Sequence, residues 1–290
     1  MRRVLLGILF YFGGIVLLSA VVAPWAFWVW DGFFPGEEPF RRVFNRVLMV
    51  TALLLLWPLA RYWGIRSWSE LGLRDRGQLP KEWLRWMGWG VLSVGLLFLM
   101  QMWMGQREWK GTGELGQFVE FFASAGAVAV LEEILFRGLF FLVLLRMWPG
   151  KAWWVGGVTC LFFATTHYLK AENPPGEVVW WTGWEAWGGM LMELGNLEML
   201  ALRWVTLLLV GGVLCALVYR QGHLWGCMGL HMGWVMGLKS LNHVTEWRGG
   251  AGSWWFQADV LSGLSAELLL LAMLLMVLWP GWGKSGGKAG

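Results

Sequence analysis

Long apolar runs, each about the length of a membrane-spanning helix, are separated by short polar stretches in this sequence. The runs cover residues 4–30, 44–63, 85–104, 117–147, 152–169, 201–219, 223–239 and 261–280. Apolar residues are nearly consecutive within each run, whereas the strands of a membrane barrel alternate apolar and polar side chains. The pattern therefore predicts an all-α fold, a polytopic transmembrane helical bundle of about eight helices.

Composition and charge support the membrane class. Hydrophobic residues make up 57% of the chain and charged residues only 14%, which is unusual for a soluble domain. The net charge is +4, but Lys and Arg are scattered over short loops and form no basic face for nucleic acid. More of the Lys and Arg residues lie in loops on the side of the membrane that holds the N-terminus, six of them within residues 61–85. Both termini are therefore expected to be cytoplasmic. Pro24 follows the only small-residue cleavage site, at Ala23, so the first run is interpreted as a retained span.

Charged residues inside the run 117–147 are the first candidates for chemistry. Residues 131–138 read LEEILFRG, with two adjacent glutamates and an arginine in an apolar helix. Each ionised group at membrane depth costs on the order of 2.5–3.5 kcal/mol, so the three need partners or a function. Glu133 and Arg137 are four residues apart and can pair, whereas Glu132 points about 100° away. Glu132 is therefore the candidate general base, unless both acids only neutralise Arg137 and fix helix packing.

Two histidines occur in similar apolar settings on other predicted helices. His167 ends the sequence LFFATTH, with Phe163 one turn before it, and His231 lies within LWGCMGLHMGW. A single histidine in a helix is more often a satisfied core residue than a catalyst. Two histidines together with a glutamate pair, on three spans of one bundle, favour a shared polar site.

These motifs resemble those of the CPBP intramembrane proteases, which include the CAAX prenyl endopeptidases and Abi-like proteins. That family carries EExxxR, then FxxxH, then a later helix with HxxxN or a variant. Glu132, Glu133 and Arg137 match the first motif, Phe163 and His167 match the second, and His231 begins the third. The resemblance covers about residues 115–240 and rests on the combination and order of the motifs.

The resemblance implies a glutamic endopeptidase that hydrolyses a peptide bond inside the membrane. Glu132 and His167 would activate a water molecule, and His231 would stabilise the developing oxyanion. Glu133, Arg137 and Phe163 would support the catalytic helices, and no cofactor would be required. One position departs from the pattern, because Val235 stands where many relatives have an asparagine that can bind the oxyanion.

A three-part organisation follows from the pattern and the resemblance. Residues 1–114 are expected to form N-terminal transmembrane helices and a cytoplasmic loop. Residues 115–240 would form the catalytic helical core, with an interfacial loop at 170–200, a stretch rich in Pro, Gly, Trp and acids. Residues 241–290 would form the last transmembrane helix and a disordered tail. The expected location is a bacterial cytoplasmic membrane.

Other functions remain open from the residues alone. Glu132, His167 and His231 could hold zinc, which would make the chain a metal-dependent protease of the same fold. The loss of an oxyanion donor at Val235 is compatible with a non-catalytic membrane scaffold or immunity protein. A proton-coupled carrier is disfavoured, because the sequence shows no repeats. The expected partners are the lipid bilayer and a membrane-associated protein or peptide, with a sorting or lipid anchor near its C-terminus.

Overall fold

A computed structural model gives the fold and describes residues 2–36, 38–73, 79–111, 113–167, 169, 171–174, 176–193, 197–249, 254–260 and 263–280. The chain forms two compact units, one made of Met1–Arg66 and Thr165–Leu200 and the other of Ser67–Ala164 and Ala201–Gly290. The tail expected to be disordered lies outside the described residues. The three-part organisation expected from the sequence stays a prediction.

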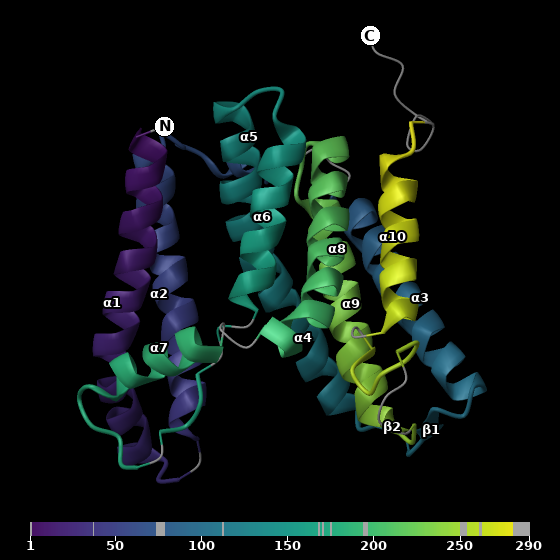
Figure 1. Ribbon diagram of the computed structural model, residues 1–290, viewed down its shortest axis with the longest axis horizontal. Coiled ribbons are helices and arrows are strands. Elements are labelled where there is room, and N and C mark those ends of the chain that lie inside the picture. Colours follow the sequence, from purple (N-terminus) through teal and green to yellow (C-terminus); the bar gives the residue numbers. More distant parts are fainter. Residues whose placement is uncertain are drawn as a thin grey trace. The chain divides into compact units, whose positions relative to one another are not determined.

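The first unit is a pair of long helices with a third helix lying across them (Figure 1). Helix α1 (Arg2–Phe33) packs beside α2 (Phe40–Tyr62), and α7 (Thr182–Glu193) crosses α1. Gly183 permits this crossing, because a Cβ atom there would overlap the backbone of Ala20. The indole nitrogen of Trp187 donates to Ser19 Oγ at 2.9 Å. The segment expected to be an interfacial loop thus contains a helix, and its place at the interface stays a prediction.

The second unit contains the remaining helices and a short two-stranded ribbon. Its elements are η1 (Trp68–Leu71), α3 (Leu79–Trp103), β1 (Arg107–Trp109), α4 (Leu115–Glu133), η2 (Ile134–Val143), α5 (Leu144–Met147), α6 (Ala152–Thr166), α8 (Leu197–Gln221), α9 (Trp225–Val244), β2 (Thr245–Trp247) and α10 (Leu264–Leu278). Helix α6 ends, and α8 begins, in residues grouped with the first unit. Strands β1 and β2 pair antiparallel, with Arg107 opposite Trp247, and so connect the end of α3 to the end of α9.

The predicted all-α membrane bundle is confirmed, since each apolar run coincides with a helical segment. Within the described residues, four helices are long and apolar enough to cross a membrane, namely Arg2–Phe33, Phe40–Tyr62, Lys81–Trp103 and Trp204–Gln221. Helices α6 and α10 are apolar but shorter. The chain is therefore an integral membrane protein.

Close contact between α3 and α9 depends on glycines spaced four residues apart. Gly229, Gly233 and Gly237 all face α3, and a Cβ atom on Gly233 would come within 3.0 Å of the Cα atom of Gly90. Small residues at this spacing let two helix backbones approach each other in a membrane, where lipid supplies no hydrophobic drive for helix association. The α9 glycines therefore fix the position of the helix that carries His231.

Replacing Gly233 by Ala is expected to destabilise the protein by about 1–3 kcal/mol, because backbone atoms cannot rotate away from an added methyl group. Gly95→Ala on α3 is the matched control, since nothing lies within 4 Å of a Cβ atom at Gly95. The gain in helix propensity should leave that control neutral or slightly stabilised. Unfolding midpoints of the two variants in detergent would test the difference, and equal midpoints would contradict it.

Candidate active site

The two glutamates lie where an α-helix becomes a π-helix. Helix α4 ends at Glu133, and η2, a π-helix from Ile134 to Val143, continues it directly into α5. A π-helix makes i→i+5 hydrogen bonds, is rare, and occurs mostly as short bulges at functional sites. The change in helical repeat reorients the side chains that follow Glu133, and residues 136–143 are all buried. The run 117–147 is thus one continuous helical segment in which a π-helix lies between two α-helical parts.

Glu133 and Arg137 form an ion pair that is completely buried. Arg137 Nη1 donates to Glu133 Oε1 at 2.9 Å, and neither side chain is exposed to solvent. The guanidinium carbon also lies 4.3 Å from the ring centroid of Phe163 on α6 and 5.8 Å from that of Phe136. A cation over an aromatic face gains more when it is desolvated. Phe163 therefore stabilises the arginine that neutralises Glu133.

His231 of α9 binds the same carboxylate oxygen. Its Nδ1 atom lies 2.8 Å from Glu133 Oε1. An ionised carboxylate only accepts hydrogen bonds, and Glu133 is paired with Arg137, so the Nδ1 hydrogen donates and Nε2 is the ring atom left for chemistry. The 98 residues that separate Glu133 from His231 gave no sign of this contact in the sequence. The role of Glu133 as the hydrogen-bond partner of His231 was therefore not predicted from the sequence.

Glu132 lies on the other side of the imidazole ring. Its Oε2 atom is 4.0 Å from His231 Nε2, and 29% of the Glu132 side chain is exposed, in contrast to the fully buried Glu133. A separation of this size is too long for a direct hydrogen bond. Glu132 is thus the more exposed carboxylate of the pair, and its Oε2 atom, which faces His231, is buried.

The structure brings five of the predicted residues into one unit. Glu132, Glu133 and Arg137 come from one helical segment, Phe163 from α6 and His231 from α9, with the rings of Phe163 and His231 6.4 Å apart in an edge-on arrangement. His167 directly follows α6, four residues after Phe163, and is half-buried. It is grouped with the other unit, so its place beside Glu132 stays a prediction.

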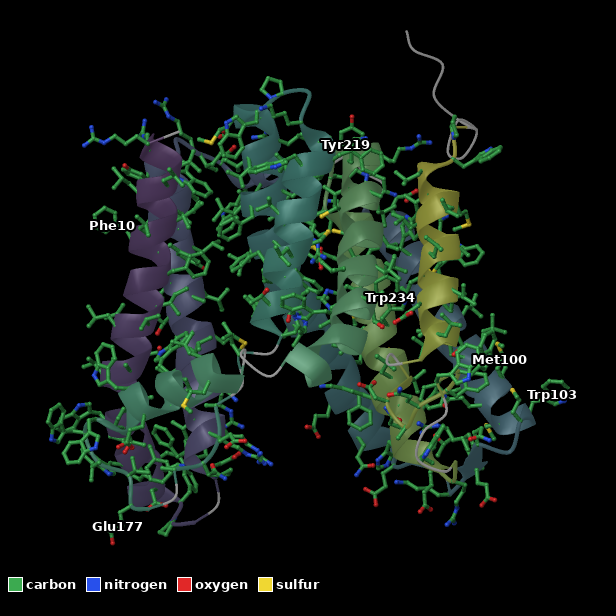
Figure 2. The ribbon with its side chains drawn as sticks, in the orientation of Figure 1. Phe10, Met100, Trp103, Glu177, Tyr219 and Trp234 are labelled. Carbon is green, nitrogen blue, oxygen red and sulfur yellow. The ribbon has the colours of Figure 1, made fainter. Side chains whose placement is uncertain are left out.

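Val235 packs among apolar side chains and offers no hydrogen-bond donor. It contacts the cluster of Ala125, Ala129 and Met232 between α4 and α9. The neighbouring Trp234, labelled in Figure 2, is buried on α9 and donates its indole hydrogen to Ser93 Oγ at 2.9 Å. That hydrogen is already used within the protein, and a second oxyanion donor stays unassigned.

Potential metal ligands are sparse in the part of the chain that the structure describes. No group of three or more His, Cys, Asp and Glu side chains there has an arrangement suited to a metal ion. Glu132 and His231 would supply two ligands, and His231 Nδ1 is already hydrogen-bonded to Glu133. A tetrahedral catalytic zinc needs three protein ligands, so these two residues do not form such a site without a further ligand.

Comparison with known protein families finds a match to the model described as type II CAAX prenyl endopeptidase Rce1-like, over residues 114–237. Residues 114–237 thus match the Rce1-like family model. The match begins next to Leu115, the first residue of α4, ends within α9, and contains Glu132, Glu133, Arg137, Phe163, His167 and His231. Comparison with curated proteins and with solved structures found no match.

The match to the Rce1-like family model supports the resemblance identified from the motifs. The family name describes endopeptidases that act on CAAX proteins, and it implies a CAAX-type protease. The helices that carry Glu132 and His231 belong to a membrane-embedded bundle. The chain is therefore a membrane endopeptidase whose surroundings are a lipid bilayer and whose substrate is a protein or peptide.

Proposed function

We propose that the chain is a glutamic intramembrane endopeptidase that cleaves a peptide bond in a membrane-associated protein or peptide without a metal ion. The observation that carries this proposal is a linked series of four side chains. Glu132 Oε2 lies 4.0 Å from His231 Nε2, and His231 Nδ1 lies 2.8 Å from Glu133 Oε1. The same Glu133 oxygen lies 2.9 Å from Arg137 Nη1. The series places one partly exposed carboxylate beside an imidazole ring held by a buried ion pair. A general base and an electrophilic group in such proximity suit acyl transfer to water.

In the proposed reaction, Glu132 removes a proton from a water molecule, and the water oxygen bonds to the scissile carbonyl carbon. The carbonyl oxygen becomes an oxyanion, and His231 Nε2 donates a hydrogen bond to it. The carbon–nitrogen bond then breaks, and Glu132 returns its proton to the leaving amine, so that a carboxyl group and an amine are released. His167, four residues after Phe163, would orient the water together with Glu132.

The hydrogen bond to Glu133 sets a condition on His231. Because Nδ1 donates to Glu133, Nε2 can donate to an oxyanion only when the ring carries both protons. The Glu133 carboxylate, itself neutralised by Arg137, would hold the doubly protonated ring in place. This role gives a function to Glu133 beyond its pairing with Arg137.

Two alternative functions make different predictions. A zinc-dependent protease of the same fold would need a metal ion on Glu132, His167 and His231, and a scaffold or immunity protein would not cleave at all. The scaffold alternative rests on Val235, whose side chain cannot bind an oxyanion. Loss of one oxyanion donor can lower the catalytic rate by about 10²–10³-fold. We further propose a bacterial cytoplasmic membrane as the location, with both termini cytoplasmic and a substrate anchored by a sorting or lipid group.

The direct test is cleavage of a prenylated CAAX peptide by the purified protein in lipid vesicles, followed by mass spectrometry of the products. Cleavage should persist after treatment with a strong chelator, and elemental analysis should find less than one equivalent of zinc per active site. Loss of activity on chelation that zinc restores would favour the zinc-dependent mechanism. Absence of cleavage for all anchored peptides would favour the scaffold.

A further inference from the structure

A partly open groove lies between α1 and α2 in the first unit. Its volume is about 260 Å³, and its lining residues are Gly7, Phe10, Tyr11, Leu55, Pro58, Leu59 and Tyr62. The buried hydroxyl of Tyr11 already donates to the carbonyl oxygen of Ala52 at 3.0 Å. The other lining side chains are aliphatic or aromatic, so the groove suits an apolar ligand.

The floor and the walls of the groove come from residues of different size. At Gly7 the two helices lie close together, because a Cβ atom there would come 2.5 Å from Trp63 Nε1. Phe10, labelled in Figure 2, is 74% exposed on α1, and Pro58 is exposed on α2. A glycine between larger side chains leaves a channel that is open along one side.

The dimensions of the groove correspond to part of one acyl chain. On α2 the lining extends from Leu55 to Tyr62, seven residues that span about 10 Å along the helix. The hydrocarbon core of a bilayer is about 30 Å thick, so one leaflet contributes about half of that depth. Pockets for drug-sized ligands are larger, about 300–1,000 Å³, and enclose most of the ligand. A single narrow chain within one leaflet fits better.

Arginines gather at the Tyr62 end of the groove. Arg2 and Arg3 begin α1, Arg61 lies in the last turn of α2, and all three are exposed. The guanidinium carbon of Arg3 lies 5.1 Å from the ring centroid of Tyr62, which lines the groove. This contact places the Arg3 guanidinium at one end of the apolar channel.

No carboxylate neutralises these three arginines among the described residues, where none of them forms an ion pair. Residues 2–30 and 39–69 contain no Asp or Glu at all. The planar guanidinium presents a fork of N–H donors that matches a phosphate group. Basic residues next to a membrane-spanning helix also attract anionic lipids. The charge at this end of the groove therefore complements an anionic headgroup.

We propose that this groove binds an anionic phospholipid, with one acyl chain in the channel and the phosphate on Arg3. Arg2 and Arg61 add positive charge at the same end. The site lies outside residues 114–237, which match the family model, and it does not depend on the proposed cleavage.

The test measures phospholipid binding to the purified full chain in dodecyl maltoside by native mass spectrometry. Phosphatidylglycerol and phosphatidylcholine with identical acyl chains are titrated separately, and each Kd is taken from the first lipid adduct. The wild type should bind phosphatidylglycerol at least about tenfold more tightly, because charge-assisted hydrogen bonds to phosphate are strong and no choline cation neutralises this lipid. Arg3→Gln should remove most of that preference, and Arg3→Gln with Arg61→Gln should bring the ratio of the two Kd values to about one.

Two matched controls accompany these variants. Arg41→Gln removes an exposed arginine at the other end of α2 and should change the affinity less than about twofold, since charges farther apart than about 10 Å are screened. Phe10→Ala removes a wall of the groove and should weaken the binding of both lipids by a few fold. Leu9→Ala should not, because Leu9 is exposed on α1 but does not line the groove.

Three results would overturn the lipid site. Equal wild-type affinities for the two lipids would leave no role for the arginines. Equal losses in Arg3→Gln and Arg41→Gln would assign the preference to net charge, and unchanged binding in Phe10→Ala would exclude the groove. None of these measurements uses cleavage, so the proposed function is tested separately.

Discussion

Replacing Glu132 by Gln is expected to lower kcat for peptide cleavage by about 10²–10⁴-fold, because an amide cannot accept the proton of the attacking water. Substrate binding should change little, since Gln keeps the size and hydrogen-bonding reach of Glu. The side chain is partly exposed, so the thermal unfolding midpoint should remain close to that of the wild type. Steady-state kinetics on the prenylated peptide in vesicles, with calorimetry on the same samples, would measure both quantities.

Glu120→Gln provides the matched control for this prediction. Glu120 is on the same helix, α4, but it is exposed and should not affect the rate. If Glu132→Gln and Glu120→Gln were equally active, Glu132 could not be the general base. The inactive Glu132→Gln protein should also hold its substrate long enough for co-purification, and mass spectrometry of the bound peptides would then identify the natural substrate.

The fold was predictable from the sequence because membrane helices leave a strong local signal. Each apolar run is long enough to be recognised by itself, and the adjacent charges at Glu132, Glu133 and Arg137 stand out against an apolar background. The helix boundaries in the structure differ from the predicted ones by only a few residues. The run predicted to end at residue 239, for example, is α9, which ends at Val244. The helix in the segment 170–200 was missed, since its mixture of Pro, Gly and acids is typical of a loop.

The active-site geometry was less predictable because it depends on contacts between distant segments. The four-residue spacing of Glu133 and Arg137 indicated their pairing, but nothing in the sequence indicated that His231 shares the same carboxylate oxygen. The π-helix was also unexpected, since residues 134–143 have an ordinary apolar composition and the altered hydrogen bonding arises from packing.

Removing Glu133 is expected to affect stability and activity together. In Glu133→Leu the Arg137 guanidinium would stay fully buried without its carboxylate. Breaking a buried ion pair at one partner costs about 3–5 kcal/mol. The variant should therefore unfold at markedly lower denaturant or temperature and yield little folded protein. It would also lose cleavage, because His231 Nδ1 no longer has its acceptor.

A double variant separates the two roles of Glu133. Replacing both partners, as in Glu133→Leu with Arg137→Met, removes the unpaired charge, and such apolar replacements of buried ion pairs are often neutral or stabilising. We expect the double variant to recover most of the unfolding free energy lost in Glu133→Leu, while cleavage remains at least about 100-fold below the wild type because the imidazole is no longer oriented by a carboxylate. Calorimetry and cleavage kinetics in vesicles, on the wild type, Glu133→Leu and the double variant, would test this prediction. Recovery of cleavage along with stability would show that Glu133 acts only as the counter-ion of Arg137, and His231 would then need no carboxylate partner.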